Sequence, residues 1–312
     1  MSRRRPLVGY AAALTAVTLW SLNASVSRTL LDGGLSASRL AELRTAGTFA
    51  LLLVAIALVR PRLLRVPIGE IRPLVALGVF GIGLLYVSYS LAVERIKIGV
   101  ALTIEYLAPA LILIWLALVR RRRLPAELVA AIVLALVGCA AMVGSYGSLD
   151  GVGVAAALAA AFGYAFYLLT AERLSGRYHP ATTLVWAFGA GTLVLFAVQP
   201  PHSFPFERLE GSADVALAVE VIVVGTLLPF ALMLLAVRHV TAIRIAVVGA
   251  SEPALSALFA YLIHDERLSV VQILGGLLLL GAVVWVQVQR PNLPAELAAA
   301  GAEPRRQPAG RA

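Results

Sequence analysis

Apolar runs of about 20 residues follow one another along almost the whole chain, separated by short segments rich in arginine, glycine and proline. A helix of about 20 residues covers the ~30 Å hydrocarbon core of a bilayer, where backbone groups find no water and must bond within the segment. Hydrophobic residues make up 60% of the 312 residues and charged residues 14%, against about 45–50% and about 25% in soluble domains. The sequence predicts an all-α integral membrane protein.

Charged or Gly/Pro-rich borders divide these runs into ten predicted transmembrane helices. The first follows three arginines in the manner of a signal peptide, but no convincing small-residue cleavage site follows it, and we interpret it as an uncleaved helix. Residues 291–312 lack periodicity and predict a disordered cytoplasmic tail. The predicted helices cover residues 7–27, 38–59, 72–93, 98–119, 126–144, 151–171, 181–199, 214–237, 242–263 and 268–288.

Basic residues in the connections predict the orientation in the membrane, because they collect on the cytoplasmic side. One face would carry 19 of them and the other 5, which places both termini in the cytoplasm. The net charge of +9 is then explained without a nucleic acid partner. The larger group consists of Arg3, Arg4, Arg5, Arg60, Arg62, Arg65, Arg72, Arg120 to Arg123, Arg173, Arg177, Arg238, Arg244, Arg290, Arg305, Arg306 and Arg311, and the smaller of Arg28, Arg95, Lys97, Arg208 and Arg267.

A shift of 144 residues superposes the two halves of the chain. It carries Pro109-Ala110-Leu111 onto Pro253-Ala254-Leu255 and Arg123-Leu124 onto Arg267-Leu268. We therefore predict a first repeat at 1–147 and a second at 148–290, with five helices in each. Since five is odd, the second repeat enters the membrane from the opposite side. Transporters with such inverted repeats bind their substrates near the midplane, between the repeats.

Two glutamates lie deep inside predicted helices, where a charge costs about 2.5–3.5 kcal/mol on insertion scales. Glu105 and Glu252 are too central to reach the interface easily, so they either face a cavity or remain neutral and hydrogen-bond to a neighbouring helix. Arg44 is also deep, and either a structural ion-pair partner or a cavity residue. For Arg39, Glu42, Glu94, Arg95 and Glu220 an interfacial position is expected, where long side chains can reach water or pair.

Prolines interrupt the same helices. A proline has no N–H for the carbonyl four residues earlier and crowds it, so Pro109 frees the carbonyl of Glu105, which also bears one of the buried carboxyls. Pro253, beside Glu252, and Pro229 act likewise. Carbonyls freed in a bilayer need water, a side chain or a ligand. The prolines therefore predict helix breaks at a cavity, the alternative being kinks satisfied by neighbouring serine or threonine.

Aromatic and amide side chains supply a candidate cavity lining. Three pairs lie three residues apart and so share a helix face, although interhelical packing or an interfacial aromatic belt would explain them as well. The pairs are Trp20 with Asn23, Tyr86 with Tyr89, and Tyr164 with Tyr167.

No motif for catalysis or cofactor binding is found. The sequence has no His/Cys/Asp cluster with metal-ligand spacing, no phosphate-binding loop and no Ser–His arrangement, and its one cysteine, Cys139, lies within an apolar run. We therefore expect no enzyme activity, no cofactor and no metal.

Four segments resemble the drug/metabolite transporter superfamily, EamA type. They are LWSLNASVSRTLLDGGLSASRLAELR (19–44), FGYAFYLLTAERL (162–174), SEPALSALFAYLIHDERLS (251–269) and IGVALTIEYLAPAL (98–111), the last being similar to the branch that exports threonine and homoserine. Two features depart from the family pattern: Ser21, where glycine is frequent, and the four arginines at 120–123, where Glu-Arg is usual.

The resemblance implies ten helices in two inverted repeats and efflux of small metabolites across a bacterial inner membrane. The predicted function is secondary transport by alternating access, with Glu105 recognising a substrate amine or cycling a proton. Arg44 would hold a substrate carboxylate or, like Glu252, act in gating or a structural ion pair. The expected partners are a small-molecule substrate, the lipid bilayer and, for antiport, protons. The energy coupling is left open, because proton antiport and facilitated diffusion are both compatible with the sequence. A passive channel or lipid-handling protein is the alternative, and the oligomeric state is left open.

Overall fold

The computed structural model describes residues 5–96, 98–119, 126–143, 150–264 and 269–288. Parts of the sequence prediction therefore lie outside the described residues: the tail at 291–312, the arginine run at 120–123, and the basic residues Arg3, Arg4, Lys97, Arg267 and Arg290.

Six helices in the described part are long and apolar enough to cross a membrane. Four are single α-helices, and two are composite, at Ile68–Arg95 and Ser212–Ala236. Their components are α1 (Pro6–Asp32), α2 (Ala37–Val59), α3 (Ile71–Ala76), η3 (Leu77–Gly83), α4 (Leu84–Arg95), α8 (Gly151–Leu174), α9 (Pro180–Val198), α10 (Ser212–Ile222), η6 (Val223–Leu227) and α11 (Leu228–Ala236).

The other predicted runs form shorter helices. Residues 98–119 contain α5 (Ile98–Glu105) and α6 (Ala108–Leu118), and residues 242–263 contain α12 (Ala242–Gly249) and α13 (Glu252–His264). The remaining two runs form α7 (Ala126–Val143) and α14 (Val270–Val288). The 3-10 turn η2 (Ile68–Glu70) begins the composite helix Ile68–Arg95, and the connections contain the 3-10 turns η1 (Pro61–Leu64), η4 (Pro201–Ser203) and η5 (Phe206–Leu209). The described chain is thus all-helical, and the first helix continues beyond its predicted end to Asp32.

Helix irregularities occur at equivalent places in the two halves. The gap between α5 and α6 and the gap between α12 and α13 are related by the same 144-residue shift that aligns the sequence. Pro109 and Pro253 lie in the first turns of the helices after these gaps. A backbone N–H at this position has no partner within the helix, so a proline costs no hydrogen bond there. The π-helical segments η3 and η6 also overlap under this shift. Pro229 follows η6 within α11, so that its composite helix is π-distorted and not interrupted.

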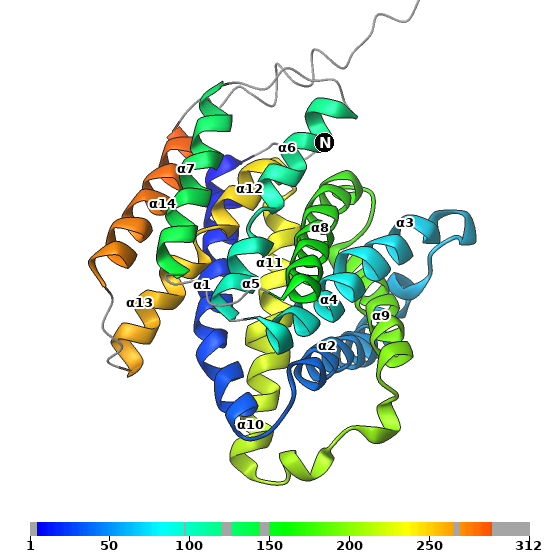
Figure 1. Cartoon of the computed structure of the whole chain (residues 1–312). Coiled ribbons are helices and arrows are strands. Elements are labelled where there is room, and N and C mark those ends of the chain that lie inside the picture. Colours follow the sequence, from blue (N-terminus) through cyan, green and yellow to red (C-terminus); the bar gives the residue numbers. More distant parts are fainter. Residues whose placement is uncertain (1–4, 97, 120–125, 144–149, 265–268, 289–312) are drawn as a thin grey trace, which may run out of the picture.

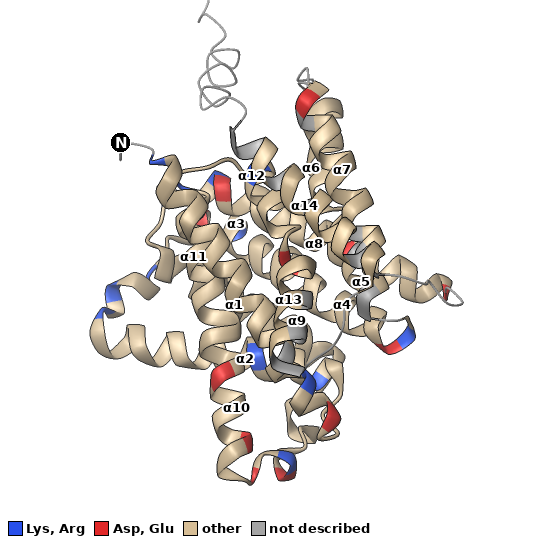
Figure 2. Cartoon of the chain, turned by 90° about the vertical axis from the view of Figure 1, so that its left-hand side faces the viewer, with Lys and Arg blue, Asp and Glu red and all other residues tan. Residues whose placement is uncertain are grey.

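The helices pack around an aromatic centre (Figure 1). Helix α1 contacts α11, α12 and α13, while α2 packs on α9 and α4 on α8; α7 and α14 form a pair at one flank. Phe230 of α11 makes edge contacts with Trp20, Tyr167 and Phe188, with ring centroids 5.1–5.5 Å apart. Figure 2 shows that most charged residues lie at helix ends and connections, as expected for a helical bundle in lipid.

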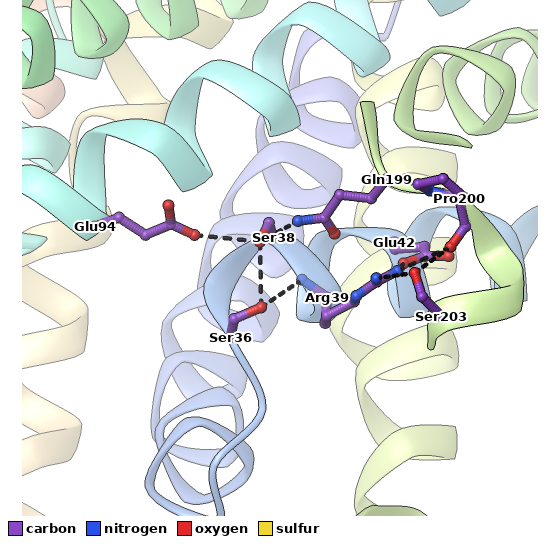
Figure 3. Close-up of polar contacts among 8 residues, drawn as sticks. All are labelled: Ser36, Ser38, Arg39, Glu42, Glu94, Gln199, Pro200 and Ser203. Carbon is purple, nitrogen blue, oxygen red and sulfur yellow. Dashed lines mark hydrogen bonds and ion pairs between the residues drawn. The ribbon is translucent and has the colours of Figure 1, made fainter. Parts of the chain in front are cut away.

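A polar network anchors the start of α2 (Figure 3). Ser38 donates to Glu94 at the end of α4 (3.2 Å) and accepts from Gln199 after α9 (2.7 Å). Arg39 pairs with Glu42 and donates to Ser203 at 2.6 Å. Glu42 is only 3% exposed, and of the two roles expected for it, reaching water or pairing, the structure shows the pairing. These contacts fix α2 against α4 and α9.

A glycine in η3 permits the close contact with α9. A Cβ on Gly78 would collide with the carbonyl oxygen of Ala187 and lie 2.6 Å from the Ala190 Cβ. We predict that Gly78→Ala destabilises the protein by about 1–3 kcal/mol through overpacking, measured as a lower unfolding midpoint in detergent. Gly69→Ala is the matched control, because a Cβ added at Gly69 would meet no other atom within 4 Å. Equal midpoints for the two variants would contradict this packing.

Candidate functional site

A cavity of about 640 Å³ lies among seven helices, within the usual size range of small-molecule sites. Its lining comes from α1, α2, α4, α5, α8, α11 and α13, together with Tyr106 in the gap after α5. The lining consists of Trp20, Asn23, Ala24, Ser27, Arg28, Leu31, Asp32, Ala37, Leu40, Ala41, Arg44, Leu85, Tyr86, Tyr89, Ser90, Val93, Leu102, Glu105, Tyr106, Tyr164, Phe230, Glu252 and Ser256.

The structure brings eight of the nine candidate substrate-binding residues to this one cavity: Trp20, Asn23, Arg44, Tyr86, Tyr89, Glu105, Tyr164 and Glu252.

Tyr167 is the exception among the nine candidates. Its hydroxyl donates to the Phe230 carbonyl at 3.3 Å within the core, and it is absent from the cavity lining. Three residues at 3.6 per turn leave about 60° between the side chains of Tyr164 and Tyr167, and Tyr167 packs against Phe230 and not against the cavity. A shared helix face therefore does not imply a shared cavity.

Sequence reasoning missed several lining residues. Helix α2 contributes four lining residues, of which only Arg44 was predicted. Ser27 lies one turn beyond Asn23 on α1, and its spacing could have identified it. Tyr106 borders Glu105, and only the break in the helix turns both side chains to the cavity. No sequence signal singled out Phe230 or Ser256.

Arg44 occupies a polar corner of the cavity. Its Nη2 donates to the Ser27 hydroxyl at 2.9 Å and to Asn23 Oδ1 at 3.3 Å. The guanidinium also lies over the Tyr86 ring, 5.6 Å from its centroid, a favourable cation–π arrangement. Within the described residues, Arg44 forms no ion pair with a carboxylate.

The acidic corner is built at the two helix breaks. Glu105 is the last residue of α5 and Glu252 the first of α13, so each carboxyl lies where a helix is interrupted. Tyr106 and both carboxyl-bearing residues line the same cavity. Carboxyl groups from the two halves of the chain therefore face a common space.

The deep end of the cavity holds a buried hydroxyl. Tyr164 is 4% exposed, and its hydroxyl has no hydrogen-bond partner among the described residues. It lies against Gly249, the last residue of α12, where a Cβ would be 2.7 Å from the hydroxyl oxygen. Trp20 meets the Tyr164 ring edge-on at 6.3 Å. This end is aromatic, with a polar atom available to a bound molecule.

The mouth of the cavity lies at the connection between α1 and α2. Arg28 and Asp32 are lining residues there, and their side chains are 64% and 76% exposed. Near the opposite end of α1, the Arg244 guanidinium of α12 donates to the Tyr10 hydroxyl at 3.1 Å. Arg244 was counted among the basic residues of the predicted cytoplasmic face, at the start of the predicted helix 242–263; it lies in α12 and is 7% exposed. Arg28 and Asp32 thus mark an exposed end of the cavity, and the Tyr10–Arg244 contact lies near the other end of α1.

Two connecting segments are held by charged side chains outside the bundle core. The backbone N–H of Ala242, at the start of α12, donates to Glu172 at 3.0 Å. At the start of α8, Asp150 accepts from the Val152 N–H at 3.0 Å and from Arg95 at 3.3 Å. These two hydrogen bonds lower the pKa of the Asp150 carboxyl, and the bond from the Val152 N–H has the larger effect.

The chemical groups that line the cavity suit an organic molecule with charged and apolar parts. No group of three or more His, Cys, Asp or Glu residues suited to a metal occurs in the described part of the chain. The cavity instead combines a guanidinium, two carboxyls, hydroxyls and aromatic rings. Such groups bind and orient a small polar molecule.

Comparisons with known proteins agree with this architecture. The model of the EamA-like transporter family matches residues 7–144 and again 151–288. The second match is offset by 144 residues from the first, which is the shift that superposes the two halves of the sequence.

Several transporters are similar in sequence. The chain is 26% identical to the uncharacterized inner membrane transporter YicL of Salmonella typhimurium over 220 residues, covering 69% of this chain and 72% of that protein. It is 28% identical to the threonine/homoserine exporter RhtA of Escherichia coli K12 over 235 residues, covering 74% and 75%. A crystal structure with 19% identity superposes with a TM-score of 0.73 over 90% of this chain and 97% of the other, which shows a common fold.

Proposed function

Because the chain belongs to the EamA-like transporter family, we propose that it exports small amino acids or closely related metabolites across the bacterial cytoplasmic membrane, as a secondary transporter. The observation that carries this proposal is the cavity, which presents a cationic corner at Arg44 and an acidic corner at Glu105 and Glu252. A zwitterion needs both charges. The sequence similarity to a threonine/homoserine exporter supports the same substrate class.

Glu105 is the first candidate for the substrate ammonium. It borders a helix break, lines the cavity and comes from the first half of the chain, opposite Glu252 from the second half. A carboxylate can accept charge-assisted hydrogen bonds from an ammonium. The same group would serve a proton-coupled cycle, and the proposal includes both proton antiport and facilitated diffusion.

The proposed topology is ten transmembrane helices in two inverted five-helix repeats, with both termini in the cytoplasm. The repeated family match, the equivalent helix breaks and the arginine distribution support it. In this topology the α1–α2 connection faces away from the cytoplasm, and the open mouth beside Arg28 and Asp32 corresponds to an outward-facing state. Export by alternating access then requires the Tyr10–Arg244 contact at the opposite end to open.

Export from cells tests this function. Bacteria that express the protein, or carry an empty vector, are loaded with a panel of amino acids as peptides, and the free amino acids appearing in the medium are measured over time. We expect faster release of threonine, homoserine or a similar small amino acid, with saturation at high internal concentration. Release equal to the empty vector for every compound would overturn the proposal, and release that never saturates would instead indicate a passive pore.

A further inference from the structure

Glu220 is an acidic residue that the sequence placed at the interface, and the structure places it beside the cavity lining. It lies on α10, in the second half of the chain. Its Oε2 accepts a hydrogen bond from Nδ2 of Asn23 at 2.8 Å. Asn23 in turn accepts from Arg44. A continuous chain of contacts thus links an acid of the second half to the cavity guanidinium of the first.

The partners of Asn23 fix the orientation of its amide. Its Oδ1 accepts from Arg44 Nη2 at 3.3 Å and from the Ser27 hydroxyl at 3.1 Å, while its Nδ2 faces Glu220. A guanidinium only donates and an ionised carboxylate only accepts. The reversed amide would set donor against donor and acceptor against acceptor. Asn23 therefore transmits the position of Glu220 to Arg44.

The π-helical segment after α10 is shaped around this amide. A Cβ on Gly225, within η6, would collide with the Asn23 side chain. The Thr226 hydroxyl donates to the Val221 carbonyl at 2.8 Å and supports the widened turn. Asn23 itself is 3% exposed. The space for the amide is consequently provided by the backbone of the second half.

The contacts leave part of the Arg44 guanidinium available to the cavity. Both hydrogen bonds to α1 use Nη2, the Tyr86 ring covers one face, and no ion pair with a carboxylate is present among the described residues. Glu220 provides negative charge near Arg44, and its hydrogen-bonded link to the guanidinium runs through the Asn23 amide. Because both hydrogen bonds to α1 use Nη2, the guanidinium retains other N–H donors of its planar fork, which suits a carboxylate.

We propose that Arg44 is the anion subsite of the cavity, and that Glu220, acting through Asn23, is a positioning residue that orients its guanidinium toward the carboxylate of the transported compound. This inference rests on the proposed function and adds a requirement to it: a good substrate has a free carboxylate. Transport of esters and simple amines should therefore be poor, even where they carry the same ammonium and side chain.

Three variants separate charge, hydrogen bond and background effects. Asn23→Asp places a carboxylate against Arg44, which occupies the guanidinium, and repels Glu220. Glu220→Gln keeps an acceptor for the Asn23 amide but removes the charge. Glu207→Gln is the matched control, because Glu207 is exposed in η5 and lies outside the cavity lining.

Transport is measured in proteoliposomes with threonine, threonine methyl ester and 1-aminopropan-2-ol, the amine left when threonine loses its carboxylate. For the wild type, we expect a KM for threonine about tenfold or more below that of the two analogues, since a bidentate charged contact is lost in each. Asn23→Asp should abolish this preference by raising the KM for threonine alone. Glu220→Gln should weaken it, and Glu207→Gln should leave it unchanged. An identical preference in Asn23→Asp and the wild type would overturn the inference.

Binding gives a second test that does not depend on threonine transport. Lactate carries the carboxylate without the ammonium, and a ligand raises the unfolding midpoint of a protein that binds it. Lactate should raise the midpoint of the purified wild type and of Glu207→Gln, but not that of Asn23→Asp. No lactate-dependent shift in the wild type contradicts the anion subsite even if threonine is exported. If threonine is not exported but lactate binds, the export proposal fails and the subsite stands.

Discussion

Glu105→Gln is expected to reduce threonine export by about 10- to 100-fold, because a neutral amide loses the charge-assisted contact with the substrate ammonium. Glutamine has nearly the same volume and still fits at the end of α5 beside the helix break. Export is measured as the initial rate of threonine release from loaded cells at matched protein levels.

The kinetic form of that loss separates the two roles proposed for Glu105. A raised KM with an unchanged maximal rate indicates recognition of the amine. A lowered maximal rate together with lost dependence on a pH gradient indicates proton cycling. Glu127→Gln is the control, because Glu127 is exposed in the first turn of α7, away from the cavity. A Glu105→Gln protein that exports threonine as fast as the wild type would exclude both roles.

Ala24→Trp is expected to reduce export to the level of cells without the protein. Ala24 lines the cavity between Asn23 and Ser27 on α1 and is exposed to it. An indole at this position would fill the space between the mouth and Arg44. Because the side chain enters a cavity and not the packed core, the unfolding midpoint should stay near that of the wild type.

The control for this obstruction is Ala50→Trp, which adds the same side chain at an exposed position of α2 that does not line the cavity. It should export threonine normally. Normal export by Ala24→Trp as well would show that the substrate does not pass through this cavity.

Much of the fold was predictable because a bilayer enforces simple rules. Apolar length locates the helices, and the 144-residue repeat anticipates that irregularities in one half recur in the other, as the gaps before Ala108 and Glu252 do. The π-helical segments were not predicted. Their sequences are apolar and glycine-containing like their surroundings, and they are defined by contacts with other helices, such as that of Gly78 with α9.

The candidate site was predictable where a residue was costly in lipid. Glu105, Glu252 and Arg44 are conspicuous in an apolar helix, and all three line the cavity. The partner of Glu220 was not predicted, because Asn23 is 197 positions away in the sequence. Tyr167 was wrongly predicted to line the cavity, because helical periodicity shows which residues share a face but not which other helix that face contacts.

The most direct test of the account is counterflow of radiolabelled threonine in proteoliposomes that contain only the purified protein. Vesicles loaded with unlabelled threonine should accumulate label transiently and saturably, because the cavity binds the amino acid and exposes it to each side in turn. Vesicles with Glu105→Gln should accumulate little. Label that enters linearly with concentration, without a transient maximum and equally in both proteins, would contradict a substrate-binding cavity between the two halves.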